Sequence, residues 1–380
     1  MSSIPPHGPE GMERRTDIAF YGFRGGPGGI SKVMLNLINE TSMAGFHVDV
    51  LLHSDAPETR DLDPKTRIIR LGKAPAIGRF LPLARYVASN GPQVLLSNRE
   101  WANRNAVLAR MASRAGTKLV FRVGNPPSYG IKKRGALKGW LRRLSIKATY
   151  QRAGLIIANS GKIAEEVRNM TGIDPARIIR IPNPTVPEDI LERSSRPVSH
   201  PWFHDKGPPV VLAVGRLAKQ KDFSTLLAAM GILRMEYCLE ARLIILGEGN
   251  ERRMLEDMAR SLGLEGAIDM PGFVPEPFPY MARASLFVLS SAWEGSPNVL
   301  IEALAIGVPV VSTDCPSGPR EILQGGKYGR LVPVGDPEAL AKAMFETLKH
   351  PHPPEYLREA AEPFRSAACA RKYLEAMGMV

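Results

Sequence analysis

Two pairs of charged residues stand out by their type and spacing. Arg216 and Lys221 lie in a turn after an apolar run, and Glu294 and Glu302 lie on either side of a marked helix start. A guanidinium and an ammonium group together suit a diphosphate. Carboxylates accept hydrogen bonds from ribose hydroxyls in nucleotide folds. The pairs together predict a site for a sugar attached to a diphosphate, although a surface lysine or an incidental acid would explain any one residue alone.

Other candidate turns contain glycines or small residues where an apolar run gives way to a helical pattern. Ser296 is a typical N-cap and Pro297 a typical first helical residue, so we expect a helix start whose amides bind an anion. The turns at 25–29, 246–249 and 313–321 allow a ligand to approach the backbone, but plain tight turns explain them equally well. The first of them lacks the G-x-G-x-x-G spacing of dinucleotide sites, which argues against an oxidoreductase.

Short β-branched apolar runs alternate with helix-period segments along the chain. We expect strands at 17–23, 47–53, 67–71, 93–97, 118–123 and 154–159, and near 210–215, 242–247, 267–270, 285–290, 309–313 and 330–333. We expect helices at 29–44, 79–89, 101–115, 136–150 and 161–171, near 222–236, 251–263, 298–307 and 337–348, and over 354–378. This alternation predicts an α/β fold with parallel sheets covered on both faces.

A proline-rich stretch at 181–209 separates two halves of similar size. Linker composition of this kind indicates a domain boundary. We therefore predict two Rossmann-like, doubly wound domains facing a central cleft. The expected parts are an N-terminal domain (1–185), a linker (186–209), a C-terminal domain (210–355) and a helical segment (356–380).

The composition is that of a globular enzyme. Of 380 residues, 44% are hydrophobic and 23% charged, which excludes a disordered chain. The three cysteines, Cys238, Cys315 and Cys369, are widely spaced, so we expect a reducing compartment and neither a disulfide framework nor a zinc site. The opening residues lack the apolar run of a signal peptide, and no run approaches the ~18 apolar residues of a membrane span.

The net charge of +12 is concentrated in the first half of the chain. Residues 1–200 carry 31 basic and 16 acidic side chains, whereas 201–380 carry 19 and 22. Such a bias indicates either an anionic partner or a solvated basic face. A nucleic-acid-binding protein is the alternative class. Because the basic stretch between Glu100 and Glu165 has few aromatic residues and no recognition motif, we expect no nucleic acid partner.

The segment 131–150 has the pattern of an amphipathic helix. Its apolar stripe consists of Leu137, Trp140, Leu141, Leu144 and Ala148, and basic residues surround the stripe. Such a helix can rest on an anionic lipid surface. The stripe can equally be core packing beside a solvated face, so both interpretations stay open.

Together these turns resemble the retaining glycosyltransferases of family 4, which have the GT-B fold. The resemblance is strong over about 208–345 and weaker over 15–185. It runs through Gly28-Gly29, Val214-Gly215-Arg216 with Lys221, Gly247-Glu248-Gly249, Gly272-Phe273-Val274, and the E-x7-E motif of Glu294 and Glu302. The fold implies that the last helix returns to the N-terminal domain.

The resemblance implies a role for each matched position. Arg216 and Lys221 would hold the donor diphosphate, and Glu302 the ribose. Glu294, with the backbone of Gly295, Ser296 and Asn298, would hold the transferred sugar and phosphate. Val299 and Leu300 are further candidates for binding the donor. Gly28 and Gly29 would approach the diphosphate from the other domain, while Gly247, Phe273 and Val274 would lie near the ribose and base. Neither a metal nor a cofactor is expected.

One feature departs from the family. Many relatives carry a histidine beside the sugar in the N-terminal domain, whereas residues 54–199 contain none. The turn that contains Arg122 and Asn125 is similar to that of transferases which build surface polysaccharides. We therefore expect Arg122 and Asn125 to take the role of the missing histidine.

The resemblance implies a retaining hexosyltransferase of the cytoplasm, peripheral on the inner-membrane face through 131–150. Its expected donor is a UDP-hexose or UDP-N-acetylhexosamine. Its expected acceptor is an oligosaccharide or a polyprenyl-diphosphate-linked sugar in cell-surface polysaccharide synthesis. A GDP-mannose-dependent mannosyltransferase is the alternative within the fold, and an epimerase or phosphorylase is a further one.

Overall fold

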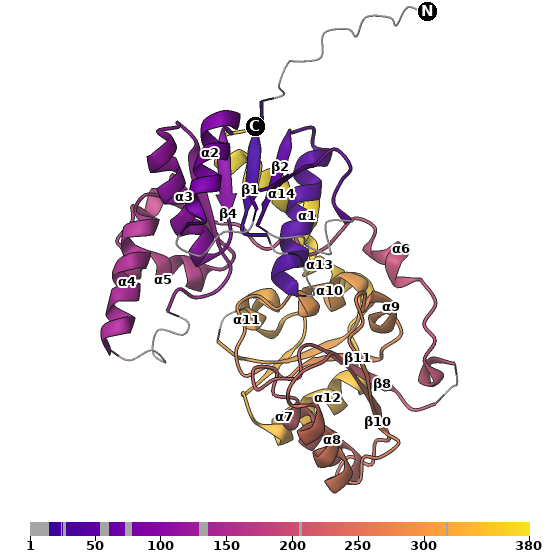
Figure 1. Ribbon diagram of the computed structural model, residues 1–380. Coiled ribbons are helices and arrows are strands. Elements are labelled where there is room, and N and C mark those ends of the chain that lie inside the picture. The colour runs from indigo at the N-terminus through magenta and orange to yellow at the C-terminus, as the bar shows by residue number, and fades with distance from the viewer. Residues whose placement is uncertain are drawn as a thin grey trace, which may run out of the picture.

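The computed structural model contains two parallel β-sheets, one in each half of the chain, flanked by helices (Figure 1). It describes residues 15–23, 25, 28–53, 61–72, 78–128, 136–204, 207–316 and 318–380. The first sheet has the order β3-β2-β1-β4-β5-β6-β7 and the second β10-β9-β8-β11-β12-β13. Their strands are β1 (Ile18–Tyr21), β2 (Val48–Leu52), β3 (Arg67–Arg70), β4 (Val94–Ser97), β5 (Lys118–Val123), β6 (Leu155–Ala158), β7 (Ile178–Arg180), β8 (Val210–Val214), β9 (Arg242–Leu246), β10 (Ile268–Gly272), β11 (Leu286–Leu289), β12 (Val310–Thr313) and β13 (Arg330–Val332).

Helices follow most strands, as the apolar periodicity predicts. Those of the first domain are α1 (Gly29–Met43), α2 (Phe80–Asn90), α3 (Glu100–Ser113), α4 (Ala136–Tyr150) and α5 (Gly161–Thr171). Those of the second are α7 (Phe223–Met235), α8 (Arg252–Ser261), α9 (Phe278–Met281), α10 (Asn298–Ile306), α11 (Pro319–Ile322) and α12 (Pro337–Lys349). The connection contains α6 (Ile190–Ser194), and the chain ends with α13 (Pro354–Glu359) and α14 (Ser366–Met377). The predicted fold class, two doubly wound Rossmann-like domains, is confirmed.

The structure differs from the sequence prediction in its shortest elements. The strand β7 and the helices α6, α9 and α11 were not expected, because three to five residues are too few to give a period. The segment predicted as one helix over 354–378 is two helices separated by a 3-10 turn, Glu362–Phe364. Pro363 lies in that turn and has no amide hydrogen to donate, which favours the break.

The last helix crosses back to the first domain. In Figure 1, α14 (yellow) lies among the indigo elements of the N-terminal half, beside α1. Its residues Ala370, Tyr373, Leu374 and Met377 share one apolar core with Ile18 and Phe20 of β1 and Met34 of α1. The chain therefore joins the domains twice. The two crossings run side by side, where the amides of Thr185 and Val186 donate to the Phe364 carbonyl.

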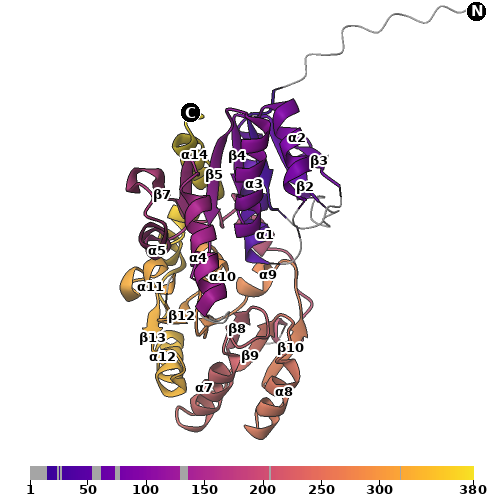
Figure 2. The ribbon, with the colours of Figure 1, turned by 60° about the vertical axis from the view of Figure 1, so that its left-hand side comes forward.

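Both sheets reverse their strand order beside their first strand, between β1 and β4 and between β8 and β11. Ligands of open α/β sheets bind at such points, beyond the carboxyl ends of the strands. The helices that begin near these points, α1 and α10, meet between the domains (Figure 2). No helix within the described ranges is long and apolar enough to cross a bilayer.

Candidate active site between the two domains

Three loops of the C-terminal domain are bonded into one unit. The Leu217 amide donates to the Glu248 carbonyl (3.0 Å), and the Ala292 amide donates to the Gln220 carbonyl (2.9 Å). A side chain at Gly247 would place its Cβ 1.9 Å from the Gly215 carbonyl oxygen. The close contact between these two loops therefore requires a glycine at position 247. No bound ligand is needed to explain that glycine.

Lys221 and Glu294, which the resemblance places at the diphosphate and at the transferred sugar and phosphate, pair directly with each other. The Lys221 Nζ lies 2.6 Å from Glu294 Oε1, and the Ser291 hydroxyl donates to the same oxygen at 2.8 Å. Both charged side chains are largely buried. The aliphatic part of Lys221 packs on Gly215, where any Cβ would collide with it. The pair is thus held rigidly, with one cation and one carboxylate at a fixed position.

Arg216 has a different environment from Lys221. Its side chain is exposed. Within the described ranges, the structure gives it no ion pair or side-chain hydrogen bond. A guanidinium that is not engaged by its own chain retains its five donors for an anionic ligand. Arg216 is therefore an exposed charged group one residue after Gly215, on which the Lys221 side chain packs.

The helix α10 begins at Asn298, at the start of the predicted range 298–307, but the predicted cap is wrong. Pro297 is the N-cap residue, Asn298 is the first helical residue, and no side chain caps the helix. Ser296 lies outside it. The loop before it touches the other domain, because a Cβ on Gly295 would lie 2.9 Å from the Gly124 carbonyl oxygen and 3.3 Å from Asn125 Oδ1.

The side chain of Asn298 connects the two domains. Its Nδ2 donates to the Gly29 carbonyl (3.0 Å), and its Oδ1 accepts from Asn183 Nδ2 (3.0 Å) and Thr185 Oγ1 (3.3 Å). A Cβ on Gly29 would lie 3.0 Å from Asn298 Nδ2, so a larger residue there would push the Asn298 side chain aside by a few tenths of an ångström. Gly28 has φ 154° and is the N-cap of α1. The predicted site residues Gly28, Gly29 and Asn298 are thus brought together.

Arg122 and Asn125 have different partners. Arg122 is buried, and its Nη2 donates to Asn183 Oδ1 at 2.5 Å. Its guanidinium therefore supports the domain junction through Asn183 and Asn298. Asn125 faces Gly295 of the other domain instead. Of the two candidates for the histidine role, Asn125 has the position for contact with a ligand between the domains.

Both residues also line a cavity of about 240 Å³ beyond the carboxyl ends of β4 and β5. Its wall includes Trp101 of α3 and Arg142 and Tyr150 of α4. Arg142 is held there by Glu100, whose Oε2 accepts from its Nη2 at 2.6 Å. An aromatic ring among polar side chains is a surface suited to a sugar. Sequence reasoning missed this cavity.

Glu302 has a partner that sequence reasoning missed. The Lys32 Nζ of α1 lies 2.8 Å from Glu302 Oε1, although 270 positions separate the two residues. Glu302 is only 2% exposed. In the sequence Lys32 is notable only for standing where a dinucleotide fingerprint would need a glycine, so no local signal could have revealed this contact.

The remaining predicted residues surround these groups. Phe273 follows β10 and is exposed, and Val274 is partly buried beside the apolar core of the second domain. Val299 is partly buried and Leu300 is fully buried in that core, so Leu300 packs α10 against the rest of the domain.

In the described part of the chain no three acidic, histidine or cysteine side chains lie together as metal ligands do. Metal independence stays a prediction.

Cys315 lies close enough to the Lys221–Glu294 pair to be influenced by it. Burial, and then the negative charge of Glu294, raise the pKa of its thiol to about 11. Burial likewise raises the pKa of Cys369 to about 12. Because the thiolate is the reactive species, neither thiol is expected to act as a nucleophile near neutral pH.

We therefore expect one fast-reacting thiol in the native protein. Cys238 is exposed, whereas Cys315 and Cys369 are buried. At pH 8, Ellman's reagent should modify Cys238 rapidly and the other two only after unfolding. The variant Cys238→Ser should show no fast phase. Rapid modification of that variant would contradict the burial of Cys315 and Cys369.

The chain matches two family models. The model "Glycosyl transferases group 1" covers residues 197–364, and the model "Glycosyl transferase 4-like domain" covers residues 28–184. A relative is 30% identical over 88% of this chain and 90% of its own length. It is the N-acetylgalactosamine-N,N'-diacetylbacillosaminyl-diphospho-undecaprenol 4-alpha-N-acetylgalactosaminyltransferase of Campylobacter jejuni. The chain belongs to the group 1 glycosyl transferases.

A further relative agrees with this assignment, and two solved structures share the fold. The lipopolysaccharide core biosynthesis glycosyltransferase LpsE of Rhizobium meliloti is 28% identical over 84% of this chain and 85% of its own length. The crystal structure of Anabaena HepE in complex with UDP has a TM-score of 0.78 at 18% identity and covers 96% of this chain and all of its own. The galactosyltransferase WaaB has a TM-score of 0.70 at 20% identity, with coverage of 96% and 99%. The glycosyltransferase has the GT-B fold.

Proposed function

We propose that this glycosyltransferase takes its sugar from a UDP-hexose or UDP-N-acetylhexosamine, with retention and without a metal. The observation that carries the proposal is the buried Lys221–Glu294 pair, which is followed at Gly295 by the contact with Asn125 of the other domain. The exposed Arg216 lies one residue after Gly215, on which Lys221 packs. Two cations beside the amides of a helix start stabilise a departing diphosphate. The UDP complex of HepE is consistent with this donor class.

Each of these residues contacts a different part of the donor. Arg216 and Lys221 bind the diphosphate and stabilise the charge that develops as the sugar–phosphate bond breaks. Glu294, oriented by Ser291, accepts hydrogen bonds from the sugar hydroxyls. Glu302 binds the ribose. The acceptor hydroxyl attacks the anomeric carbon from the face that the diphosphate leaves, and its proton passes to the departing phosphate oxygen.

We propose that the acceptor is a polyprenyl-diphosphate-linked sugar or an oligosaccharide of cell-surface polysaccharide synthesis. The cavity lined by Trp101, Arg142 and Tyr150 would hold its terminal sugar next to Asn125. The name of the Campylobacter relative includes an undecaprenol-diphosphate acceptor, which supports a lipid-linked substrate.

The outer side of α4 supports a membrane location. Leu137, Trp140, Leu141 and Leu144 are 71%, 56%, 51% and 44% exposed, so the core-packing alternative for this stripe is wrong. Ala148 is exposed as well. The face toward the core carries Ile146 and Tyr150 instead.

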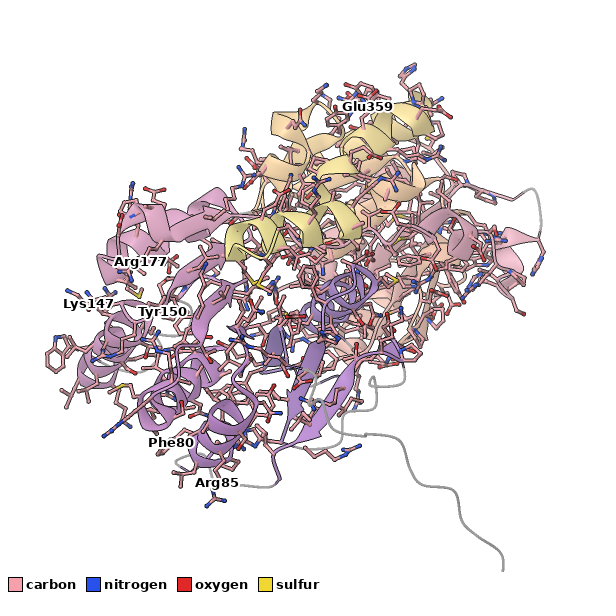
Figure 3. All side chains as sticks on the ribbon, turned by 90° about the horizontal axis from the view of Figure 1, so that it is seen from above. Phe80, Arg85, Lys147, Tyr150, Arg177 and Glu359 are labelled. Carbon is pink, nitrogen blue, oxygen red and sulfur yellow. The ribbon has the colours of Figure 1, made fainter. Side chains whose placement is uncertain are left out.

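Exposed basic residues accompany the stripe. Lys138, Arg143 and Lys147 are exposed on α4, and Lys147 lies at the outer edge of the first domain in Figure 3. Residues 131–135 lie outside the described ranges. We infer that α4 rests on the anionic cytoplasmic face of the inner membrane. Because Arg142 and Tyr150 of the same helix line the cavity, a lipid-linked acceptor bound there would remain close to the bilayer.

A thermal-shift comparison of UDP, GDP and ADP tests the donor assignment. A ligand that binds only the folded state stabilises it by about 2.7 kcal/mol at a concentration of about 100 Kd, which raises the melting temperature by several degrees. We expect the largest shift with UDP and its loss in Arg216→Ala. A shift confined to GDP would support the mannosyltransferase alternative. No shift with any nucleotide would contradict the donor site.

A further inference from the structure

Lys32 connects the domains at the residue proposed to bind the ribose. It lies in the first turn of α1, just after Gly28 and Gly29, yet its ammonium group contacts the second domain. The Nζ is 2.8 Å from Glu302 Oε1 and 4.1 Å from the centroid of the Phe278 ring. Phe278 is fully buried, so the ring is a fixed wall behind the ammonium group.

The burial of Glu302 makes this contact important for the position of its carboxylate. Within the described ranges, Lys32 is the partner that the structure gives to the Glu302 carboxylate. A buried carboxylate that loses its cation either takes up a proton or turns toward solvent. In both cases it becomes a poorer acceptor for hydroxyl groups at its present position. Lys32 therefore fixes one of the two Glu302 oxygens in place.

We propose that Lys32 is a positioning residue for the donor, acting on the ribose through Glu302. With Oε1 held by Lys32, the carboxylate is oriented so that its other oxygen accepts from the ribose hydroxyls. This inference rests on the proposed function, in which Glu302 binds the ribose of a nucleotide sugar. Because Lys32 belongs to the N-terminal domain and Glu302 to the C-terminal domain, recognition of the ribose depends on how closely the domains approach.

The test compares two ligands that differ only at the ribose. The dissociation constants of UDP and 2′,3′-dideoxy-UDP are measured by titration calorimetry for the unsubstituted protein, Lys32→Met and Lys32→Arg. Arg180→Met is the matched control, because Arg180 of β7 forms another ion pair between the domains, with Glu321 of α11. Thermal unfolding checks that each variant folds, and Lys32→Gln replaces Lys32→Met if the latter does not.

We expect Lys32→Met to weaken the binding of UDP about tenfold and the binding of dideoxy-UDP less than about twofold. The difference in affinity between the two ligands should then nearly disappear. Lys32→Arg should restore UDP binding to within about threefold, because it retains the charge. Arg180→Met should leave both constants unchanged. The double variant Lys32→Met/Glu302→Gln should bind UDP no more weakly than Glu302→Gln alone.

Three results would overturn the inference. The first is unchanged UDP binding in Lys32→Met. The second is an equal loss of affinity for UDP and dideoxy-UDP, which would mean that Lys32 acts on the phosphates or on the fold as a whole. The third is an equal effect of Arg180→Met, which would make Lys32 a general link between domains. If the unsubstituted protein does not bind UDP, the proposed donor itself is wrong. If it binds UDP but the Lys32 variants behave in one of these three ways, only the role of Lys32 is wrong.

Discussion

Replacing Lys221 or Glu294 by alanine should lower turnover by at least about a hundredfold, the loss typical of removing one group that stabilises developing charge. The two side chains are paired at 2.6 Å and largely buried, so water cannot easily replace either of them. Loss of Lys221 removes a cation from the diphosphate and leaves Glu294 without its partner. Loss of Glu294 frees Lys221 to move from its position over Gly215. Release of nucleoside diphosphate in the presence of acceptor measures the effect.

Lys219→Ala is the matched control for this prediction. Lys219 lies two positions before Lys221 in the same turn and is exposed, and the structure gives it no partner within the described ranges. We expect it to retain activity to within about twofold, since isolated surface charges contribute little. The double variant Lys221→Ala/Glu294→Ala should lose less than the product of the single losses, because the residues act as a pair. Full activity in both single variants would contradict the proposed mechanism.

The second large effect is expected on membrane binding. The double variant Trp140→Ser/Leu141→Ser removes two exposed apolar side chains from the outer face of α4. Burying one such side chain contributes about 1.5–3 kcal/mol, and partial insertion contributes less, so binding to vesicles should weaken by about tenfold or more. Flotation with phosphatidylglycerol-containing vesicles measures this. Thermal stability should hardly change, because neither side chain belongs to the core.

Met235→Ser is the matched control, because it removes an exposed apolar side chain that lies away from α4. Met235 ends α7 in the other domain and is highly exposed. We expect it to leave vesicle binding unchanged. Replacing anionic lipid by phosphatidylcholine should weaken binding of the unsubstituted protein, since basic residues flank the stripe. Equal flotation of the Trp140→Ser/Leu141→Ser variant and the unsubstituted protein would show that α4 does not bind the membrane.

The positions of the site residues along the chain were predictable because they follow from local rules. Apolar runs with β-branched residues predict strands, and glycines or charges directly after a run mark the turns beyond their carboxyl ends. Arg216, Lys221 and Glu294 were found in this way. The same rules overlooked β7 and the short helices, since a three-residue strand has no period to detect.

The orientation of side chains was not predictable from the same patterns. The apolar stripe of α4 has the periodicity of a core face, yet it is exposed, because the neighbouring sheet is covered by Ile146 and Tyr150 instead. Arg122 has the chemistry of a catalytic cation, yet it is buried against Asn183. Periodicity indicates that a helix has two faces, but only the packing of its neighbours decides which face is buried.

By itself, the sequence determined the two α/β halves and the turns that follow the strands of the second half, because each depends on residues close together in the chain. The tertiary structure decided which charges meet across the domains. Lys32 reaches Glu302, and Asn298 reaches Gly29, over separations of 270 and 269 positions. Such contacts leave no local pattern, since they depend on how two independently folded sheets are placed against each other.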